Sequence, residues 1–183
     1  MNTIALEEKQ ISTKRIYDGK IVNLRVDTVL LPNGREATRE VIEHVGAVCV
    51  VPVLPDGTTY MVRQYRYPFA EAVLEIPAGK LDAPDEPKIE CAARELEEET
   101  GFRSENLEFL MTVNTTVAFC DERIGVYIAK DLIPSKQHLD ADESIDVEEW
   151  EVKDLLDLIY SGKMTDAKTI AAILAYAQKE GIR

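Results

Sequence analysis

The sequence contains no long apolar segment, and no run approaches the ~20 residues that a membrane-spanning helix needs. Its three cysteines are widely spaced and form no Cys-x-x-Cys pair, so neither a disulfide framework nor a zinc knuckle is predicted. The first ten residues lack the apolar stretch of a signal peptide. Together these absences favour a protein of the reducing cytoplasm, where disulfides are rare.

Basic residues are in the minority: 21 Lys and Arg stand against 34 Asp and Glu, which gives a formal net charge of −13. Nucleic acid and anionic lipid both need a basic face, so neither is expected as a partner. The same charge would repel a phosphate-bearing substrate unless metal cations neutralise it. The composition therefore suggests either a solvated acidic surface or a metal-dependent site.

The first 44 residues show the pattern of a β-hairpin. Alternating apolar residues predict a strand at 22–30, and residues 39–44 can return as a second strand after a turn at 32–34. A lone hairpin is marginally stable in water, so it must pack on something. Residues 1–44 are therefore predicted to form an N-terminal β subdomain that could serve as a dimerisation arm.

Residues 45–183 mix strands with a few helices. Residues 46–53 form a nearly unbroken apolar run, which is typical of a central strand buried on both faces. Further strands are predicted at 59–67, 72–76, 107–113, 124–129 and 145–152, and helices at 86–100, 153–160 and 165–179. Asp85 is expected to cap the first helix and Gly101 to end it. This order predicts an α+β layered fold.

The first of these helices carries an unusual group of acidic side chains. On a helical projection Glu95, Glu98 and Glu99 lie within about 100° of one another. They adjoin an apolar face formed by Ile89, Ala92, Ala93 and Leu96. Burying three carboxylates together is costly unless a cation compensates, and Mg²⁺ prefers such oxygen ligands. On the helix alone, a solvated acidic face is an equally good interpretation.

The segment before the helix favours the metal interpretation. A strand ends near Glu75 and leads into a loop at Gly79, where a glycine permits close backbone approach and nearby carbonyls can ligate a cation. Arg94 directly precedes the first of the three carboxylates. Its guanidinium can fix a carboxylate in one rotamer by a bidentate pair.

These residues resemble the Nudix box. The match comprises Gly79, Glu86 and residues 94–102, which read RELEEETGF. The chain has six residues, 80–85, where the family pattern has five, so the resemblance carries over no firm role for Glu86. Residues 62–68, 75–80, 90–92 and 139–147, together with the N-terminal hairpin, are similar to the ADP-ribose pyrophosphatase branch of that family.

The resemblance implies a Nudix fold, an α/β/α sandwich with a mixed β-sheet, and Mg²⁺-dependent cleavage of a nucleoside diphosphate sugar. It implies two or three Mg²⁺ ions, with Mn²⁺ as a substitute, held by the carbonyl of Ala78 and by Glu95, Glu98 and Glu99. Catalytic roles fall to Arg94, Glu98 and Glu143. Substrate binding falls to Arg39, Glu40, Arg63, Arg66, Glu75 and Gly79. A homodimer whose N-terminal segments exchange between subunits is also implied.

Two of these assignments leave alternatives. Glu143 is the first choice for general base because it occupies the position of a loop Glu in the family, but Asp142 is a second candidate in the same acidic run. Arg63 and Arg66 are three residues apart on a strand, which puts them on opposite faces unless a bulge intervenes. Arg66 is favoured for the substrate phosphate by resemblance.

The leading functional hypothesis is hydrolysis of ADP-ribose to AMP and ribose 5-phosphate. The same chemistry on another nucleotide sugar or a dinucleotide is the nearest alternative. A regulator that senses ADP-ribose without hydrolysis should have lost the carboxylates and gained a DNA-binding segment, and neither is the case in this sequence. A purely structural acidic protein leaves the pattern from Gly79 to Phe102 unexplained.

Overall fold

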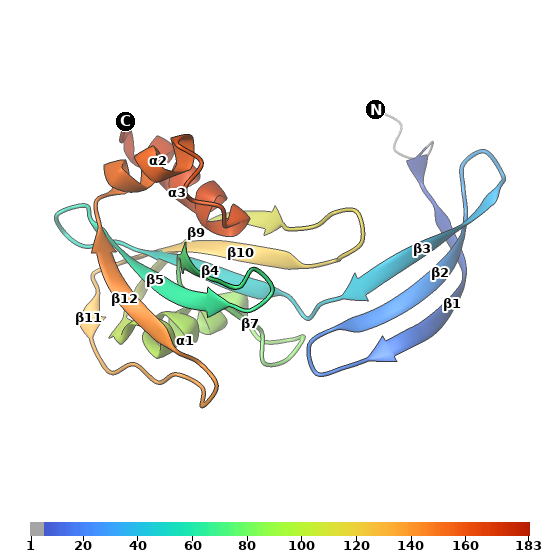
Figure 1. The fold of residues 1–183 in the computed structure, drawn as a ribbon, viewed down its shortest axis with the longest axis horizontal. Helices are drawn as coiled ribbons and strands as arrows, with labels where there is room; N and C mark the ends of the chain where they lie inside the picture. Colours follow the sequence, from blue (N-terminus) through green and yellow to red (C-terminus); the bar gives the residue numbers. More distant parts are fainter. Residues whose placement is uncertain (1–5) are drawn as a thin grey trace. The chain divides into compact units, whose positions relative to one another are not determined.

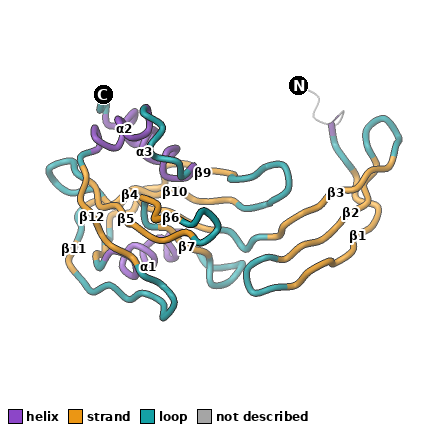
Figure 2. The backbone as a smooth tube through the Cα atoms, in the orientation of Figure 1, coloured by secondary structure: helices purple, strands orange, loops and turns teal. Residues whose placement is uncertain are grey.

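The computed structural model describes residues 6–183, which divide into two compact units (Figures 1 and 2). The first unit comprises the described residues up to Val45 together with Asn114–Arg123, and the second comprises Gly46–Val113 and Ile124–Arg183. Residues 1–5 of the predicted N-terminal subdomain lie outside the described part of the chain. Within residues 6–183, no helix has the length and apolar character needed to cross a membrane.

The first unit is a three-stranded antiparallel sheet in the order β1-β2-β3. Its strands are β1 (Lys9–Asp18), β2 (Asn23–Leu30) and β3 (Glu36–Glu43). The sequence predicted the β2–β3 hairpin but missed β1, because β1 is exposed along its whole length and its apolar residues do not alternate. The segment from 114 to 123 joins this unit: the Ile42 amide donates to the Phe119 carbonyl at 2.7 Å, and the His44 amide donates to Asp121 Oδ1 at 2.7 Å.

The second unit contains a mixed four-stranded sheet in the order β7-β4-β10-β9, in which β4 and β10 run parallel while β4 and β7 run antiparallel. A three-stranded antiparallel sheet has the order β12-β5-β6, and β11 pairs with β8. The bounds are β4 (Ala47–Pro52), β5 (Thr59–Arg66), β6 (Glu71–Glu75), β7 (Ala78–Lys80), β8 (Phe102–Arg103), β9 (Asn106–Asn114), β10 (Arg123–Lys130), β11 (Ile133–Pro134) and β12 (Ile145–Trp150).

Helices cover both faces of the sheets in this unit (Figure 1). Helix α1 (Lys88–Thr100) packs its Cys91, Ala92 and Leu96 against Val48 and Val50 of β4. Helices α2 (Val152–Tyr160) and α3 (Ala167–Glu180) pack against the opposite side of β4, in the cluster that contains Cys49, Val51, Leu155 and Ile173. Every residue of β4 is buried. The α+β class, the α/β/α sandwich and the central strand buried on both faces are therefore confirmed.

The start of α1 differs from the prediction. The helix begins at Lys88 rather than at residue 86, and its N-cap position is Pro87, which offers no side-chain cap. Asp85 does not cap the helix because it lies two residues before the extended Pro87 that precedes the first helical residue. Gly101 ends the helix as expected, with a left-handed φ of 73° and its N–H bonded to the Glu97 carbonyl.

The orientation of α1 also corrects the predicted apolar face. Ile89 is 48% exposed, whereas Glu95 and Glu99 are buried. The helix is therefore rotated so that its buried face includes two carboxylates beside Cys91, Ala92 and Leu96. Because burial of charged groups is costly, this rotation is the first structural sign of a functional site.

Candidate active site

Two carboxylates of α1 are held against strand β7. Glu99 is 5% exposed and its Oε2 accepts a hydrogen bond from the Ala78 amide at 3.0 Å. Glu95 is 9% exposed and its carboxyl group lies so close to Gly79 that a Cβ on this residue would be 1.9 Å from Glu95 Cδ. Only glycine permits this approach, so the Gly79 of the sequence motif has a direct steric role.

The electrostatics of this pair are unusual. Burial, reinforced by neighbouring carboxylates, raises the pKa of Glu99 to about 8 and that of Glu95 to about 7. The charge of Glu143 is among the causes of both rises. A group of acidic side chains that resists ionisation at neutral pH is the environment in which a bound cation is most strongly stabilised.

Arg94 holds two of the carboxylates in place. Its Nη1 donates to Glu95 Oε1 at 2.7 Å and to Glu98 Oε2 at 2.9 Å, and its Nη2 donates to the Lys80 carbonyl at 3.1 Å. The arginine therefore also ties α1 to the end of β7, a contact that the sequence analysis did not predict.

Glu86 keeps a place in this network despite the extra loop residue. Its Oε2 accepts the Asp82 amide at 2.7 Å, and its Oε1 lies 3.4 Å from Nε of Arg94. Glu86 thus fastens the loop between β7 and α1 to the same arginine. The loop also turns at Ala83, whose carbonyl accepts the Glu86 amide at 3.1 Å.

The donors fit a hard divalent cation. Glu95, Glu98, Glu99 and the carbonyl of Ala78 are oxygen ligands of the kind that Mg²⁺ and Mn²⁺ prefer, and two of them are buried carboxylates with raised pKa values. Among residues 6–183, no three His, Cys, Asp or Glu side chains are already arranged as a metal cage. The Arg94 guanidinium pairs with both Glu95 and Glu98.

The acidic loop before β12 passes the same end of α1. Gln137 Nε2 donates to the Glu99 carbonyl at 2.7 Å, and the His138 amide donates to the Glu98 carbonyl at 2.9 Å. Glu143 is exposed, and its Oε2 accepts the Asp140 amide at 3.1 Å. The charge of Glu143 contributes to the raised pKa of both buried carboxylates, and its role as general base stays a prediction.

The two arginines of β5 lie on opposite faces of the strand, as their spacing predicts. Arg66 pairs with the buried Glu75 through Nε–Oε1 at 2.6 Å and Nη2–Oε2 at 2.8 Å, and its charge acts on Glu99. Arg63 lies opposite Leu74 in the ladder and pairs with Glu148 of β12, with Nη2–Oε2 at 3.1 Å. The structure therefore brings Arg66 and Glu75 toward the carboxylates of α1 and leaves Arg63 on the other face.

The predicted substrate residues of the hairpin belong to the first unit. Arg39 forms a bidentate pair with Glu8, with Nη2–Oε1 at 2.5 Å and Nε–Oε2 at 2.9 Å. Glu40 is exposed and lies opposite Val26 in the β2–β3 ladder. Any role of these two residues in substrate binding depends on the assembly proposed below.

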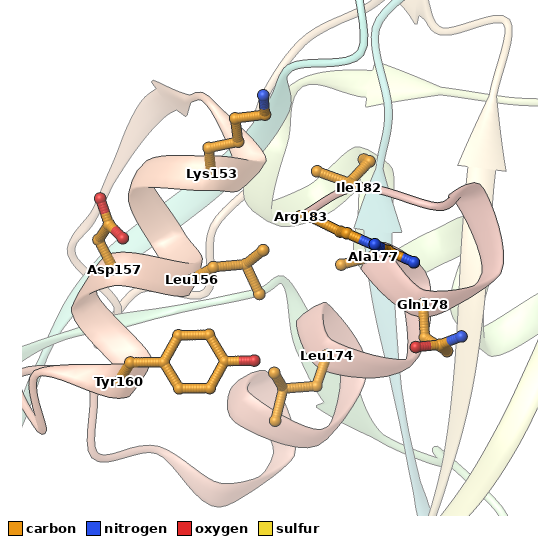
Figure 3. A pocket seen from close by; sticks show the side chains of 9 residues that line it. All are labelled: Lys153, Leu156, Asp157, Tyr160, Leu174, Ala177, Gln178, Ile182 and Arg183. Atoms are coloured by element: carbon orange, nitrogen blue, oxygen red, sulfur yellow. The ribbon is translucent and has the colours of Figure 1, made fainter.

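A cavity of about 630 Å³ opens elsewhere in the second unit, between α2, α3 and the end of the chain (Figure 3). Apolar side chains such as Leu156 and Leu174 contribute to its wall, together with the polar ends of Lys153, Tyr160 and Gln178. Its lining does not include the carboxylates of α1, so this cavity is separate from the site built on β7 and α1.

A family model described as the NUDIX domain matches residues 43–173. The match includes strands β6 and β7 and helix α1, which form the site described above. The chain belongs to the Nudix family. Residues 8–42 match the nucleoside diphosphate sugar hydrolase N-terminal domain. This second match covers strands β1 and β2 and all but the last residue of β3.

Relatives of this Nudix protein match it over nearly its whole length. An ADP-ribose pyrophosphatase of Bacillus subtilis (strain 168) is 41% identical over 98% of this chain and 97% of its own. A methanol dehydrogenase activator of Bacillus methanolicus is 40% identical over 97% and 96% of the two chains. A crystal structure of an ADP compounds hydrolase shares the fold, with a TM-score of 0.83 at 22% identity over 97% of both chains.

Sequence reasoning missed one charged residue near the site. Lys168 lies in the first turn of α3, and its ammonium contacts Glu75, the partner of Arg66. A lysine near the start of an amphipathic helix is usually solvated, so its position gave no reason to single it out. The signal that could have revealed it is the buried Glu75 on the neighbouring strand, which needs cationic partners.

Proposed function

We propose that this Nudix protein is a metal-dependent ADP-ribose pyrophosphatase that hydrolyses ADP-ribose to AMP and ribose 5-phosphate. The observation that carries the proposal is the 41% identity to an enzyme of that name over nearly the full length of both chains. The buried carboxylates of α1 support it, because they can hold the divalent cations that would neutralise the roughly two negative charges of a pyrophosphate linkage.

In the proposed reaction, water adds to one phosphorus of the pyrophosphate and the bridging P–O bond breaks. Glu95, Glu98, Glu99 and the Ala78 carbonyl would hold two or three Mg²⁺ ions, which Mn²⁺ can replace. When bound, these ions would supply positive charge for the phosphates and Lewis acidity for the attacking water. Glu143 accepts the proton of the attacking water. Arg94 keeps Glu95 and Glu98 in their rotamers, and Gly79 leaves space for the Glu95 carboxylate.

Arg66 is assigned to the substrate phosphate, and Glu75 to the substrate site as the partner that holds this arginine. The Nε and Nη2 atoms of Arg66 are engaged by Glu75, while 40% of the arginine side chain remains exposed. The guanidinium therefore presents its remaining N–H groups on the side away from Glu75, where they can donate to a phosphate oxygen. Arg63, held by Glu148 on the opposite face, is assigned a supporting role at most.

We also propose that the protein works in the cytoplasm as a homodimer in which the N-terminal unit is exchanged. Strand β1 is exposed along its length and presents Ile11, Ile16 and Tyr17, which a monomer would leave in water. Residues 1–44 would be the dimerisation arm and 45–183 the Nudix domain. Arg39 and Glu40 of one subunit would then contact the adenosine half of the substrate bound by the other.

The test is hydrolysis of a panel of nucleotides with Mg²⁺ and with EDTA. The panel contains ADP-ribose, NADH, GDP-mannose and a diadenosine polyphosphate. Several nucleotides are needed because the relatives do not all point to one substrate: the name of the Bacillus methanolicus protein states an effect on another enzyme. We expect the highest kcat/KM with ADP-ribose, AMP and ribose 5-phosphate as products, and no turnover in EDTA. A higher kcat/KM with another nucleotide would refute ADP-ribose as the preferred substrate. Tight binding of ADP-ribose without turnover would indicate the non-catalytic sensor.

A further inference from the structure

A buried ionic network lies behind Arg66. Glu75 is only 3% exposed and its carboxylate is shared between two cations, Arg66 on the open side and Lys168 on the inner side. Lys168 is 11% exposed and its Nζ also donates to Asp166 Oδ2 at 2.9 Å. Two cations thus face two carboxylates, and the network is neutral as a whole.

The charge states in this network follow from its contacts. Burial tends to raise the pKa of Glu75, but Arg66 and Lys168 outweigh it and hold that pKa below its ordinary value. Burial tends to lower the pKa of Lys168, but Glu75 and Asp166 outweigh it in turn. Glu75 and Lys168 are therefore ionised at neutral pH, as a tightly paired contact requires.

The network is also fixed to the backbone of the site. Asp166 caps α3 and accepts from the Thr169 amide at 3.0 Å and from Thr169 Oγ1 at 2.6 Å. Thr169 Oγ1 in turn accepts the Ile76 amide at 3.0 Å. The first turn of α3 thus holds the chain between Glu75 and Ala78, the stretch that runs from the arginine's partner to the proposed metal-binding carbonyl.

We infer that Lys168 is a positioning residue for Arg66: it compensates the inner side of Glu75, so that Glu75 holds the arginine by one edge and leaves its other edge for the substrate pyrophosphate. This inference rests on the proposed function. Without Lys168, the buried Glu75 and Asp166 would retain one cation between them. Arg66 would then be drawn further onto Glu75 and away from the open side, because it alone could compensate the buried charge.

The test is a double-mutant cycle on kcat/KM with Lys168→Met, Arg66→Gln and the double variant. Met keeps most of the length and the apolar stem of lysine while it removes the charge. With Arg66 present, we expect Lys168→Met to lower kcat/KM by about 10- to 100-fold, the share of a charge-assisted hydrogen bond to phosphate. In the Arg66→Gln background the same change should cost less than about threefold, because its effect passes through the arginine.

The matched control is Lys179→Met, the same substitution on the same helix, where the lysine forms an exposed ion pair with Glu108 at 2.5 Å. It should leave kcat/KM within about twofold in both backgrounds, since exposed pairs contribute little. Equal losses from Lys168→Met in both backgrounds would overturn the inference. If Lys168→Met does not fold, Lys168→Gln replaces it, and failure of both to fold would make Lys168 a residue of stability alone.

The cycle is run on whichever nucleotide of the panel the wild-type protein hydrolyses best, so a wrong substrate and a wrong role for Lys168 give different results. If none is hydrolysed, the proposed function fails, and calorimetric binding of inorganic pyrophosphate to the same four proteins takes the place of kcat/KM. Non-additive losses of pyrophosphate affinity would support the positioning role, and additive losses would refute it.

Discussion

Replacement of Glu99 by glutamine should stabilise the metal-free fold and at the same time lower the rate of hydrolysis. In the metal-free protein, burial raises the pKa of Glu99 from 4.5 to about 8. Both states hold the proton below about pH 4.5, but between about pH 4.5 and 8 the unfolded chain releases it while the folded chain keeps it. The free energy of unfolding therefore falls as pH rises through this window.

The size of the effect follows from the same values. The difference between 4.5 and about 8 corresponds to on the order of 5 kcal/mol, because each pKa unit is about 1.4 kcal/mol at 25 °C. A glutamine in place of Glu99 cannot ionise, and its side-chain oxygen can still accept the Ala78 amide. In EDTA at pH 8.5 we expect Glu99→Gln to be more stable than wild type by several kcal/mol, and at pH 4.5 to be within about 1 kcal/mol of it.

The assay is urea unfolding in EDTA at several pH values, paired with turnover in Mg²⁺. Glu90→Gln is the matched control, because it removes the same charge from an exposed position in the first turn of the same helix. Its stability difference should stay within about 1 kcal/mol at both pH values. Turnover of Glu99→Gln should fall by at least about a hundredfold. A variant less stable than wild type at pH 8.5, or one within about tenfold of wild-type turnover, would refute the reasoning.

Three further changes probe the rest of the site. Glu143→Gln should lower kcat by about 10²–10⁴-fold, with little change in KM and partial recovery of the rate at high pH. Asp142→Asn should lower kcat much less. If Glu143→Gln instead raises the Mg²⁺ concentration needed for activity, and extra Mg²⁺ restores the rate, Glu143 is a metal ligand. Gly79→Ala should displace the Glu95 carboxylate and raise the Mg²⁺ concentration needed for half activity at least about tenfold, and unchanged metal dependence would contradict the role of this close contact. The double variant Ile11→Lys and Tyr17→Lys should be monomeric by light scattering and bind ADP-ribose weakly, whereas an intact dimer would exclude β1 from the interface.

The parts of the fold that sequence predicted were those with a strong local signal. Strand β4 stood out because burial on both faces leaves an unbroken apolar run, and the site stood out because Gly79 and the residues from 94 to 102 have a fixed spacing. Strand β1 was missed because exposure on both faces removes the alternation that marks a strand.

The errors at α1 and α3 arose where tertiary contacts decide the outcome. The helical projection placed Ile89 on the buried face and left open whether Glu99 is buried, and the packing of α1 exposes Ile89 and buries Glu99. Lys168 gave no signal because its partner Glu75 is 93 positions away in the chain. Electrostatic compensation across such a distance cannot be read from local periodicity.

The segment from 114 to 123 has a consequence for synthesis of the chain. Strand β3 reaches the ribosome exit early, but its backbone partners follow much later: the His44 amide bonds to Asp121, 77 residues further on. Until that segment emerges, this edge of the small sheet has unpaired amides and can pair with another nascent chain. We therefore expect folding of the N-terminal unit to finish late in translation, after most of helix α1 and its neighbouring strands have left the ribosome.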